Sequence, residues 1–330
     1  MKLKLVVIGC GWAGKFHATG IQRDPNAELV AVVDKDLDRA KSFSDIFKVP
    51  YYHSIAQLLR DKNDEFDGAC ICTLPSTHFE LCKKLIEKGK HVFCEKPLER
   101  NVERIEQLME IADKAAVKFG VNHNQRFAPT IVEAQKLISR DSRVHMIQAS
   151  MQQNGPKEAS DLVNDYFLLT DSCCHLFDTL LFLNGNISKV HAFGKRLNSH
   201  ILSDITVNME FLNGSIGTLI HTFVGGIHES QHPFQRFEVT TSEARYTIEN
   251  MYDGLHVYPH KELYRKVWEP SVFEARDYSD SMITSVQAWI KSVVKSSAIP
   301  VGLEEARKNT LVIQACIQSL ETGEIVEVQY

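Results

Sequence analysis

The sequence predicts two domains, an α/β domain with a parallel sheet followed by an α+β domain with an antiparallel sheet. The chain has 330 residues, and a chain of this length is expected to form two domains of about 150 residues each. Over the first 122 residues apolar runs alternate with amphipathic stretches, which is typical of parallel strands covered by helices. Beyond that point strand-like runs follow one another directly. We therefore expect one domain over residues 1–122 and a second over residues 123–330.

Apolar runs mark the strands of the first domain. They cover residues 3–8, 29–33, 69–72, 91–94 and 117–121. The segment 75–89 has the pattern of a helix that stops at Gly89, and apolar residues at helical spacing fill residues 101–118. We expect both segments to be helices that connect parallel strands.

The second domain begins with a predicted helix over residues 129–139. Strand-like runs then cover residues 144–151, 189–197, 204–212, 215–223 and 236–241. Asn213 and Gly214 separate two of these runs and are typical turn residues of a hairpin. Apolar residues at helical spacing predict two late helices, one around residues 283–293 and the other around residues 306–320.

Composition excludes several classes of protein. Apolar residues make up 44% of the chain and charged residues 24%, which is ordinary for a globular protein. No run approaches 18 apolar residues and the first residues do not have the pattern of a signal peptide, so we expect a cytoplasmic protein without membrane contact. The net charge of −5, with both signs interspersed, argues against a nucleic-acid partner.

The eight cysteines lie mostly within apolar patterns and lack the spacing of a zinc site. We expect buried free thiols and no metal. The residues are Cys10, Cys70, Cys72, Cys82, Cys94, Cys173, Cys174 and Cys316.

A glycine-rich segment, Gly9-Cys10-Gly11-Trp12-Ala13-Gly14, directly follows the first predicted strand and opens a helix. In this context the glycines permit a tight turn and close approach of a pyrophosphate, whose charge the helix N-terminus favours. A glycine-rich turn without a ligand is the alternative. Asp34 lies 20 residues beyond Gly14 at the end of the next strand, where a carboxylate binds the ribose hydroxyls of an adenosine. The two features together predict dinucleotide binding.

Two further segments carry groups suited to acid-base chemistry. Glu95 and Lys96 follow the strand at residues 91–94, at the edge where open parallel sheets bind ligands. A solvated ion pair is the alternative. Asp171 and His175 are four residues apart near the start of an apolar helix, so they can share one face and one ligand. A capping aspartate beside a core histidine is the alternative there.

These segments, in this order, resemble the glucose-fructose oxidoreductase and inositol dehydrogenase family, also called Gfo/Idh/MocA. The similarity extends over nearly the whole chain. It includes GCGWAGKFH near the start, TLPSTH at 73–78, GKHVFCEKP at 89–97, NQRFAP at 124–129, DSCCHLFD at 171–178 and the closing segment at 301–328.

The resemblance implies a Rossmann domain followed by an α+β domain with a large, mostly antiparallel open sheet, with substrate held between that sheet and a nicotinamide. It assigns catalysis to Lys96, Asp171 and His175. The expected cofactor-binding residues are Gly9, Gly11, Trp12, Ala13, Gly14, Asp34, Thr73, Leu74, Pro75, His78, Glu95, Lys96, Asn124 and Arg126. The expected substrate-binding residues are Lys96, Arg126, Asn154, Tyr166, Asp171 and His175. The family often has glycines before the DxxxH segment, whereas this chain has Phe167-Leu168-Leu169-Thr170, which puts the shape of the pocket in question.

The expected activity is hydride transfer between nicotinamide and a secondary hydroxyl of a sugar-like or cyclic polyol substrate. Asp34 favours NAD, with NADP as the alternative because Arg39 lies nearby in the sequence. Either His175 or Lys96 can move the proton. Two other functions remain open, a redox-assisted lyase or glycosidase that retains NAD and a non-catalytic dinucleotide sensor. The resemblance also implies a homodimer or homotetramer.

Overall fold

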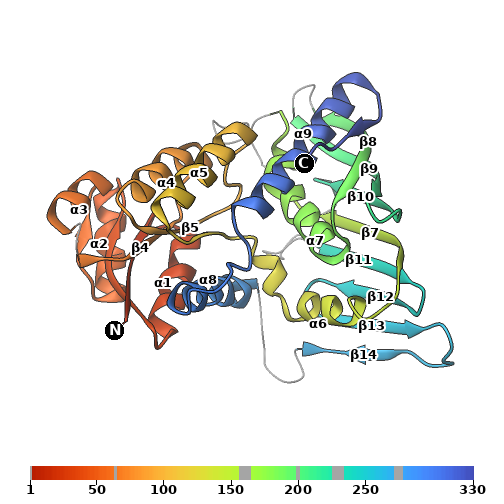
Figure 1. Ribbon diagram of the computed structural model, residues 1–330, viewed down its shortest axis with the longest axis horizontal. Coiled ribbons are helices and arrows are strands. Elements are labelled where there is room, and N and C mark those ends of the chain that lie inside the picture. Colours follow the sequence, from red (N-terminus) through yellow and green to blue (C-terminus); the bar gives the residue numbers. More distant parts are fainter. Residues whose placement is uncertain (1, 63–64, 156–164, 198–200, 225–233, 271–277) are drawn as a thin grey trace. The chain divides into compact units, whose positions relative to one another are not determined.

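The computed structural model describes residues 2–62, 65–155, 165–197, 201–224, 234–270 and 278–330 (Figure 1). The chain divides into two compact units. The first comprises Met1–Asn124 and Ser279–Arg307, and the second comprises Gln125–Tyr278 and Lys308–Tyr330. The contiguous division expected after residue 122 therefore differs from these units, because the chain returns to the first unit near its C-terminus.

A parallel sheet forms the centre of the first unit. Its strands, in the order β3-β2-β1-β4-β5-β6, form a six-stranded sheet. Their bounds are β1 Leu3–Ile8, β2 Ala27–Val33, β3 Tyr51–Tyr52, β4 Gly68–Ile71, β5 His91–Cys94 and β6 Phe119–Val121. Every residue of β4 and the last four residues of β1 are buried, as expected for parallel strands with both faces covered. Crossovers on either side of β1 and β4 run in opposite directions, so the edge beyond these two strands is the usual ligand position.

Helices connect the strands of this sheet. They are α1 Trp12–Arg23, α2 Leu37–Phe47, α3 Ile55–Lys62, α4 His78–Ile86 and α5 Val102–Ala115, with a short 3₁₀ turn, η2, at Pro75–Thr77. Local sequence explains where two of them begin. The side chains of Asp36 and Asn101 accept hydrogen bonds from backbone amides in the first turns of α2 and α5.

Helix α8 (Tyr278–Val294) explains why residues 279–307 belong to the first unit. Its buried side chains Val286, Trp289, Ile290 and Val293 join the same apolar core as β1, β2 and α1. The Trp289 ring stacks on Phe93 of β5 with ring centroids 5.4 Å apart.

A nine-stranded sheet dominates the second unit, in the order β14-β13-β12-β11-β7-β10-β9-β8-β15. The strands are β7 Val144–Gln152, β8 Ile187–Leu197, β9 Ile201–Phe211, β10 Ile216–Thr222, β11 Phe234–Thr241, β12 Ala244–Glu249, β13 Gly254–Pro259, β14 Lys266–Trp268 and β15 Val326–Glu327. The neighbours β7 and β10 pair in parallel, and the other pairs are antiparallel. Gly214, at the predicted turn between β9 and β10, has φ +80°, which explains the preference for glycine there.

One face of this sheet is covered by helices. α7 (Cys174–Asn184) packs on β7, and α6 (Pro129–Ile138) packs beside α7 and against β12 and β13. Along β7 the side chains of Ile147, Ala149 and Met151 are buried toward the core, while those of Met146 and Gln148 are exposed. Among the described residues, the β7 side chains on the other face, such as Met146 and Gln148, are therefore exposed.

The predicted fold class is confirmed, with a parallel sheet followed by a large, mostly antiparallel one. Sequence patterns missed α2 and α3 as well as β3, β12, β13, β14 and β15.

The eight cysteines are free thiols, and all but Cys72 are buried. Within the described ranges no helix is both long enough and apolar enough to cross a membrane.

Candidate functional site

The carboxyl ends of β1, β2, β4 and β5 bring most of the predicted cofactor residues to one edge of the parallel sheet. Gly9 follows β1, Asp34 follows β2, Thr73 lies two residues beyond β4, and Glu95 follows β5. Backbone hydrogen bonds continue past the strand ends, from Glu95 to the Ile71 carbonyl at 2.9 Å and from Asn122 to the Cys94 carbonyl at 2.8 Å. These contacts hold the residues that leave the sheet in a fixed arrangement.

The three glycines of the first loop differ in what surrounds them. Gly9 has φ +99°, and a Cβ added there would lie 2.5 Å from the Cys72 carbonyl oxygen. A Cβ on Gly14 would lie 2.1 Å from the Gly9 carbonyl oxygen. A Cβ on Gly11, by contrast, would meet no atom within 4 Å. The fold itself therefore requires Gly9 and Gly14, whereas the open space at Gly11 fits the close approach of a cofactor pyrophosphate.

Helix α1 begins immediately beyond Gly11, which is its N-cap and provides no side-chain cap. The first turn of α1 contains no acidic residue, so no carboxylate competes for its positive N-terminal end. Trp12 and Ala13 are the first two residues of this helix, and the Trp12 side chain is 57% exposed. This helix end has the chemistry of an anion site.

Asp34 is fixed by the glycine loop beside it. Its Oδ2 accepts a hydrogen bond from the Cys10 amide at 2.8 Å, and its Oδ1 accepts one from the Asp36 amide at 2.9 Å. The Arg39 guanidinium lies 3.8 Å from Asp34 Oδ2 and is half exposed. The carboxylate predicted to bind ribose is thus held rigidly, with a cation next to it.

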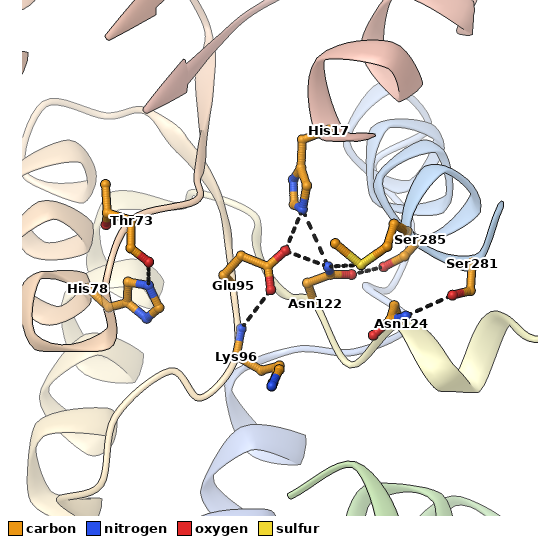
Figure 2. A network of polar contacts seen from close by, with 10 residues as sticks. His17, Thr73, His78, Glu95, Lys96, Asn122, Asn124, Ser281 and Ser285 are labelled. Atoms are coloured by element: carbon orange, nitrogen blue, oxygen red, sulfur yellow. Dashed lines mark hydrogen bonds and ion pairs between the residues drawn. The ribbon is translucent and has the colours of Figure 1, made fainter. Parts of the chain in front are cut away.

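His78 joins the loops that follow β4 and β5. Its Nε2 lies 3.1 Å from the Thr73 carbonyl oxygen (Figure 2). Its Nδ1 lies 3.0 Å from the Pro97 carbonyl oxygen. Burial lowers the pKa of this imidazole despite those carbonyl contacts. His78 therefore holds the Thr73 loop in place, while Pro75 opens η2 and the Leu74 side chain is exposed.

A buried network surrounds Glu95 (Figure 2). Its Oε1 lies 2.7 Å from His17 Nε2 and accepts a hydrogen bond from Asn122 Nδ2 at 2.8 Å. Its Oε2 accepts a hydrogen bond from the Lys96 amide at 3.2 Å. Burial alone would raise the pKa of this carboxyl, yet the hydrogen bonds from His17 and Asn122 and the charge of Lys96 hold its pKa below the ordinary value. Glu95 is consequently a buried, ionised carboxylate next to the predicted catalytic lysine.

Helix α8 completes this network from a distant part of the sequence. The Ser285 hydroxyl donates to Asn122 Oδ1 at 2.7 Å, and Asn124 Nδ2 donates to the Ser281 hydroxyl at 2.7 Å. Ser281 and Ser285 are four residues apart, so they share one face of α8.

The sequence-based prediction missed His17, Asn122, Ser281 and Ser285. His17 was within the quoted GCGWAGKFH segment, and its place three residues beyond Gly14 on the same helix face is the signal that could have found it.

In the second unit, Asp171 and His175 lie on consecutive helical segments. Asp171 is part of a π-helix, Leu168–Cys173, and His175 is the second residue of α7. Asp171 therefore lies in a π-helical turn, which is wider than the α-helical turn that the sequence predicted, and the shared face of Asp171 and His175 stays a prediction. His175 is 6% exposed. Leu168 and Leu169 are fully buried in the core, so the segment that replaces the family's glycines is packed as a helix.

Arg126 forms a buried ion pair with Asp178 of α7. Its Nε and Nη2 donate to Oδ2 and Oδ1 of Asp178, both at 2.7 Å, and the side chains are 10% and 1% exposed. Breaking a buried pair of this kind typically costs about 3–5 kcal/mol. Loss of Arg126 would therefore leave the buried Asp178 carboxylate without this partner, and the assignment of Arg126 to cofactor and substrate stays a prediction.

The other residues predicted to bind substrate have distinct surroundings. The Tyr166 hydroxyl donates to Glu321 Oε1 at 2.8 Å, and the Arg196 guanidinium lies over its ring. Asn154 is exposed, two residues past the end of β7. Among the residues that the structure describes, no cluster of three or more His, Cys, Asp or Glu side chains could hold a metal ion.

Comparison with known families gives two matches. The model described as "Oxidoreductase family, NAD-binding Rossmann fold", of the Gfo/Idh/MocA group, matches residues 3–123. The model described as "Oxidoreductase family, C-terminal alpha/beta domain", of the same group, matches residues 143–328. Together they account for most of the chain.

Full-length relatives and solved structures agree with this result. The myo-inositol 2-dehydrogenase of Thermotoga maritima is 24% identical over 338 residues, which cover 99% of each chain. An oxidoreductase from Agrobacterium radiobacter, solved with NAD⁺, L-tartaric acid and magnesium, has a TM-score of 0.89 at 17% identity over 99% of each chain. Levoglucosan dehydrogenase, solved with NADH and levoglucosan, has a TM-score of 0.88 at 18% identity over 100% of each chain. At these identities the structures show that the fold is shared.

Gly11→Ala and Gly14→Ala test which glycine leaves space for the cofactor and which one the fold itself requires. We expect Gly11→Ala to keep the wild-type melting temperature, because φ is −89° and no protein atom is near, but to weaken NADH binding about tenfold or more. Gly14→Ala should lower stability by about 1–3 kcal/mol, because its methyl group would clash with backbone. Fluorescence titration and thermal unfolding measure both effects. Wild-type NADH affinity in Gly11→Ala would contradict the placement of the pyrophosphate.

Proposed function

The chain belongs to the Gfo/Idh/MocA family of NAD-dependent oxidoreductases, and we propose that it transfers a hydride between NAD and the carbon of a secondary hydroxyl in a sugar-like or cyclic polyol. The observation that carries this proposal is the gathering of Gly11, Asp34 and Lys96 at the carboxyl edge of one parallel sheet. Such an edge binds dinucleotides in doubly wound sheets, and here it also presents an amine.

The residues at this edge fit the parts of NAD. The open space at Gly11 and the N-terminus of α1 suit the pyrophosphate, and the fixed carboxylate of Asp34 suits the ribose hydroxyls. When bound, NAD supplies the nicotinamide C4 that accepts or returns a hydride. In Figure 2 the Lys96 side chain points away from the buried Glu95 network, which leaves its amine directed outward from the strand end.

Three residues carry the proton chemistry in this proposal. During oxidation His175 takes the proton of the substrate hydroxyl, the C–H electron pair leaves as hydride, and the carbon–oxygen bond becomes a carbonyl. Lys96 stabilises the negative charge that develops on the oxygen. Asp171 orients Lys96 and His175 and tunes their charge.

The substrate class rests on chemistry and on a relative. Three polar catalytic groups suit a reacting hydroxyl with hydroxyl neighbours, because a polyol satisfies donors and acceptors that an apolar molecule would leave unpaired. The full-length relative from Thermotoga maritima is named for its action on myo-inositol. Ring-shaped polyols and pyranosides are therefore our first candidates.

Alanine variants test the catalytic assignment. Lys96→Ala and His175→Ala should each lose about 10²- to 10⁴-fold in kcat while the Kd for NADH stays near the wild-type value, because both residues act on the reacting hydroxyl. Lys114→Ala and His145→Ala are matched controls, since both side chains are exposed and neither belongs to the proposed site. Near-normal turnover in both test variants would refute the mechanism.

A substrate panel tests the proposed reaction. Inositols, pyranosides and amino sugars are incubated with enzyme and NAD, NADH is followed by its absorbance, and the new carbonyl is located by carbon NMR. We expect oxidation at a secondary ring hydroxyl. Oxidation restricted to linear or aromatic substrates, or to an anomeric or aldehyde carbon, would refute the substrate class.

The same panel tests cofactor preference when NADP replaces NAD. Asp34 should repel the 2′-phosphate of NADP, so kcat/KM should be higher with NAD. The opposite ratio would show that Arg39, 3.8 Å from Asp34, accepts the phosphate instead.

A further inference from the structure

The carboxylate of Glu95 is a buried charged group in the first unit. Glu95 is 8% exposed, and His17 and Asn122 are fully buried. A buried carboxylate without donors costs several kcal/mol, so the groups that donate to it decide where it sits. Those donors come from α1, from the residue after β6 and from the Lys96 backbone.

His17 is the donor that links this carboxylate to the cofactor-binding helix. An ionised carboxylate only accepts hydrogen bonds, so Nε2 of His17, 2.7 Å from Glu95 Oε1, carries the hydrogen. The other ring nitrogen, Nδ1, is buried and has no hydrogen-bond partner within the described ranges. A histidine retained solely for stability would gain from hydrogen bonds at both ring nitrogens. Here only Nε2 has partners, Glu95 Oε1 at 2.7 Å and Asn122 Nδ2 at 3.3 Å.

Lys96 is joined to the same carboxylate through its backbone. Glu95 Oε2 accepts the Lys96 amide hydrogen at 3.2 Å, so any shift of the carboxylate changes the direction in which the chain leaves β5. The Lys96 side chain starts at that point (Figure 2). Reaction geometry is sensitive to such shifts, because a displacement of about 1 Å can cost about 10²-fold in rate.

We propose that His17 is a positioning residue for hydride transfer, which acts through Glu95 to hold Lys96 and so couples the helix at the cofactor pyrophosphate to the reacting amine. This inference rests on the proposed function. His17 lies five residues after Trp12, the first residue of α1, so one rigid helix carries both the anion-binding end and the Glu95 donor. Asn122, oriented by Ser285, donates to the same Glu95 oxygen that His17 contacts.

Two substitutions at His17 separate positioning from packing. His17→Phe keeps an aromatic ring and removes the donor, while His17→Gln keeps an N–H that can donate to Glu95. We expect His17→Phe to lower kcat about 10²-fold, with the Kd for NADH within about threefold of wild type, and His17→Gln to recover most of kcat. His91→Phe is the matched control, since His91 begins the same strand at its far end and accepts the Lys118 amide hydrogen.

Hydrogen exchange of the Lys96 amide gives a readout that does not depend on turnover. In the enzyme without NAD, His17→Phe should accelerate exchange of this amide about tenfold relative to the amides of β4, and His17→Gln and His91→Phe should not. If no substrate is found for the wild type, the proposed function fails, and this exchange measurement still decides whether His17 positions Lys96.

Three results would overturn the inference. The first is normal kcat in a folded His17→Phe enzyme. The second is an equal loss of kcat in His17→Gln and His17→Phe. The third is an unchanged exchange rate of the Lys96 amide in His17→Phe, which would show that His17 contributes only to packing.

Discussion

A single buried carboxylate organises the first unit of this protein. Glu95 directly follows strand β5 inside the fold, where an ionised group is stable only if several donors surround it. The donors come from α1 and from the residue after β6, and α8 orients the second of them. The hydrogen-bond network around one charge therefore includes a helix near residue 17, a strand end near residue 122 and a helix near residue 285. Those elements surround the backbone that carries Lys96.

In the glycine loop, two glycines are required by the fold and one leaves space for a ligand. Gly9 and Gly14 are required because backbone atoms lie where their side chains would be. Gly11 has no such neighbour, and Asp34, held by the Cys10 amide, lies beside it. Gly9 and Gly14 therefore allow the loop to close, whereas Gly11 leaves space that suits a cofactor pyrophosphate.

Most strands of the first unit could be predicted because their signals are local. Alternating apolar runs revealed β1 and β5 with their observed ends, and Asn101 marked the start of α5. Short elements such as β3, with two residues, are too brief to show a period. The π-helix at Asp171 was missed because nothing in its sequence distinguishes it from the first turn of an α-helix.

Long-range polar contacts could not be predicted from one sequence. Nothing local indicates that Ser285 bonds Asn122 across 163 positions, or that Arg126 pairs with Asp178 across 52. Arg126 is an example, because no local signal indicates its ion pair with Asp178, and its contact with cofactor and substrate stays a prediction. A charged residue in a motif therefore needs its partners identified before it is given a role.

The central claim is that a hydride passes from a ring carbon of a polyol to NAD. It is tested most directly with a cyclic polyol that carries deuterium on its ring carbons, by mass spectrometry of the NADH formed. Direct transfer predicts one deuterium in each NADH molecule and a stoichiometric amount of ketone. NADH without deuterium, or a product formed by elimination with no accumulation of NADH, would contradict the account.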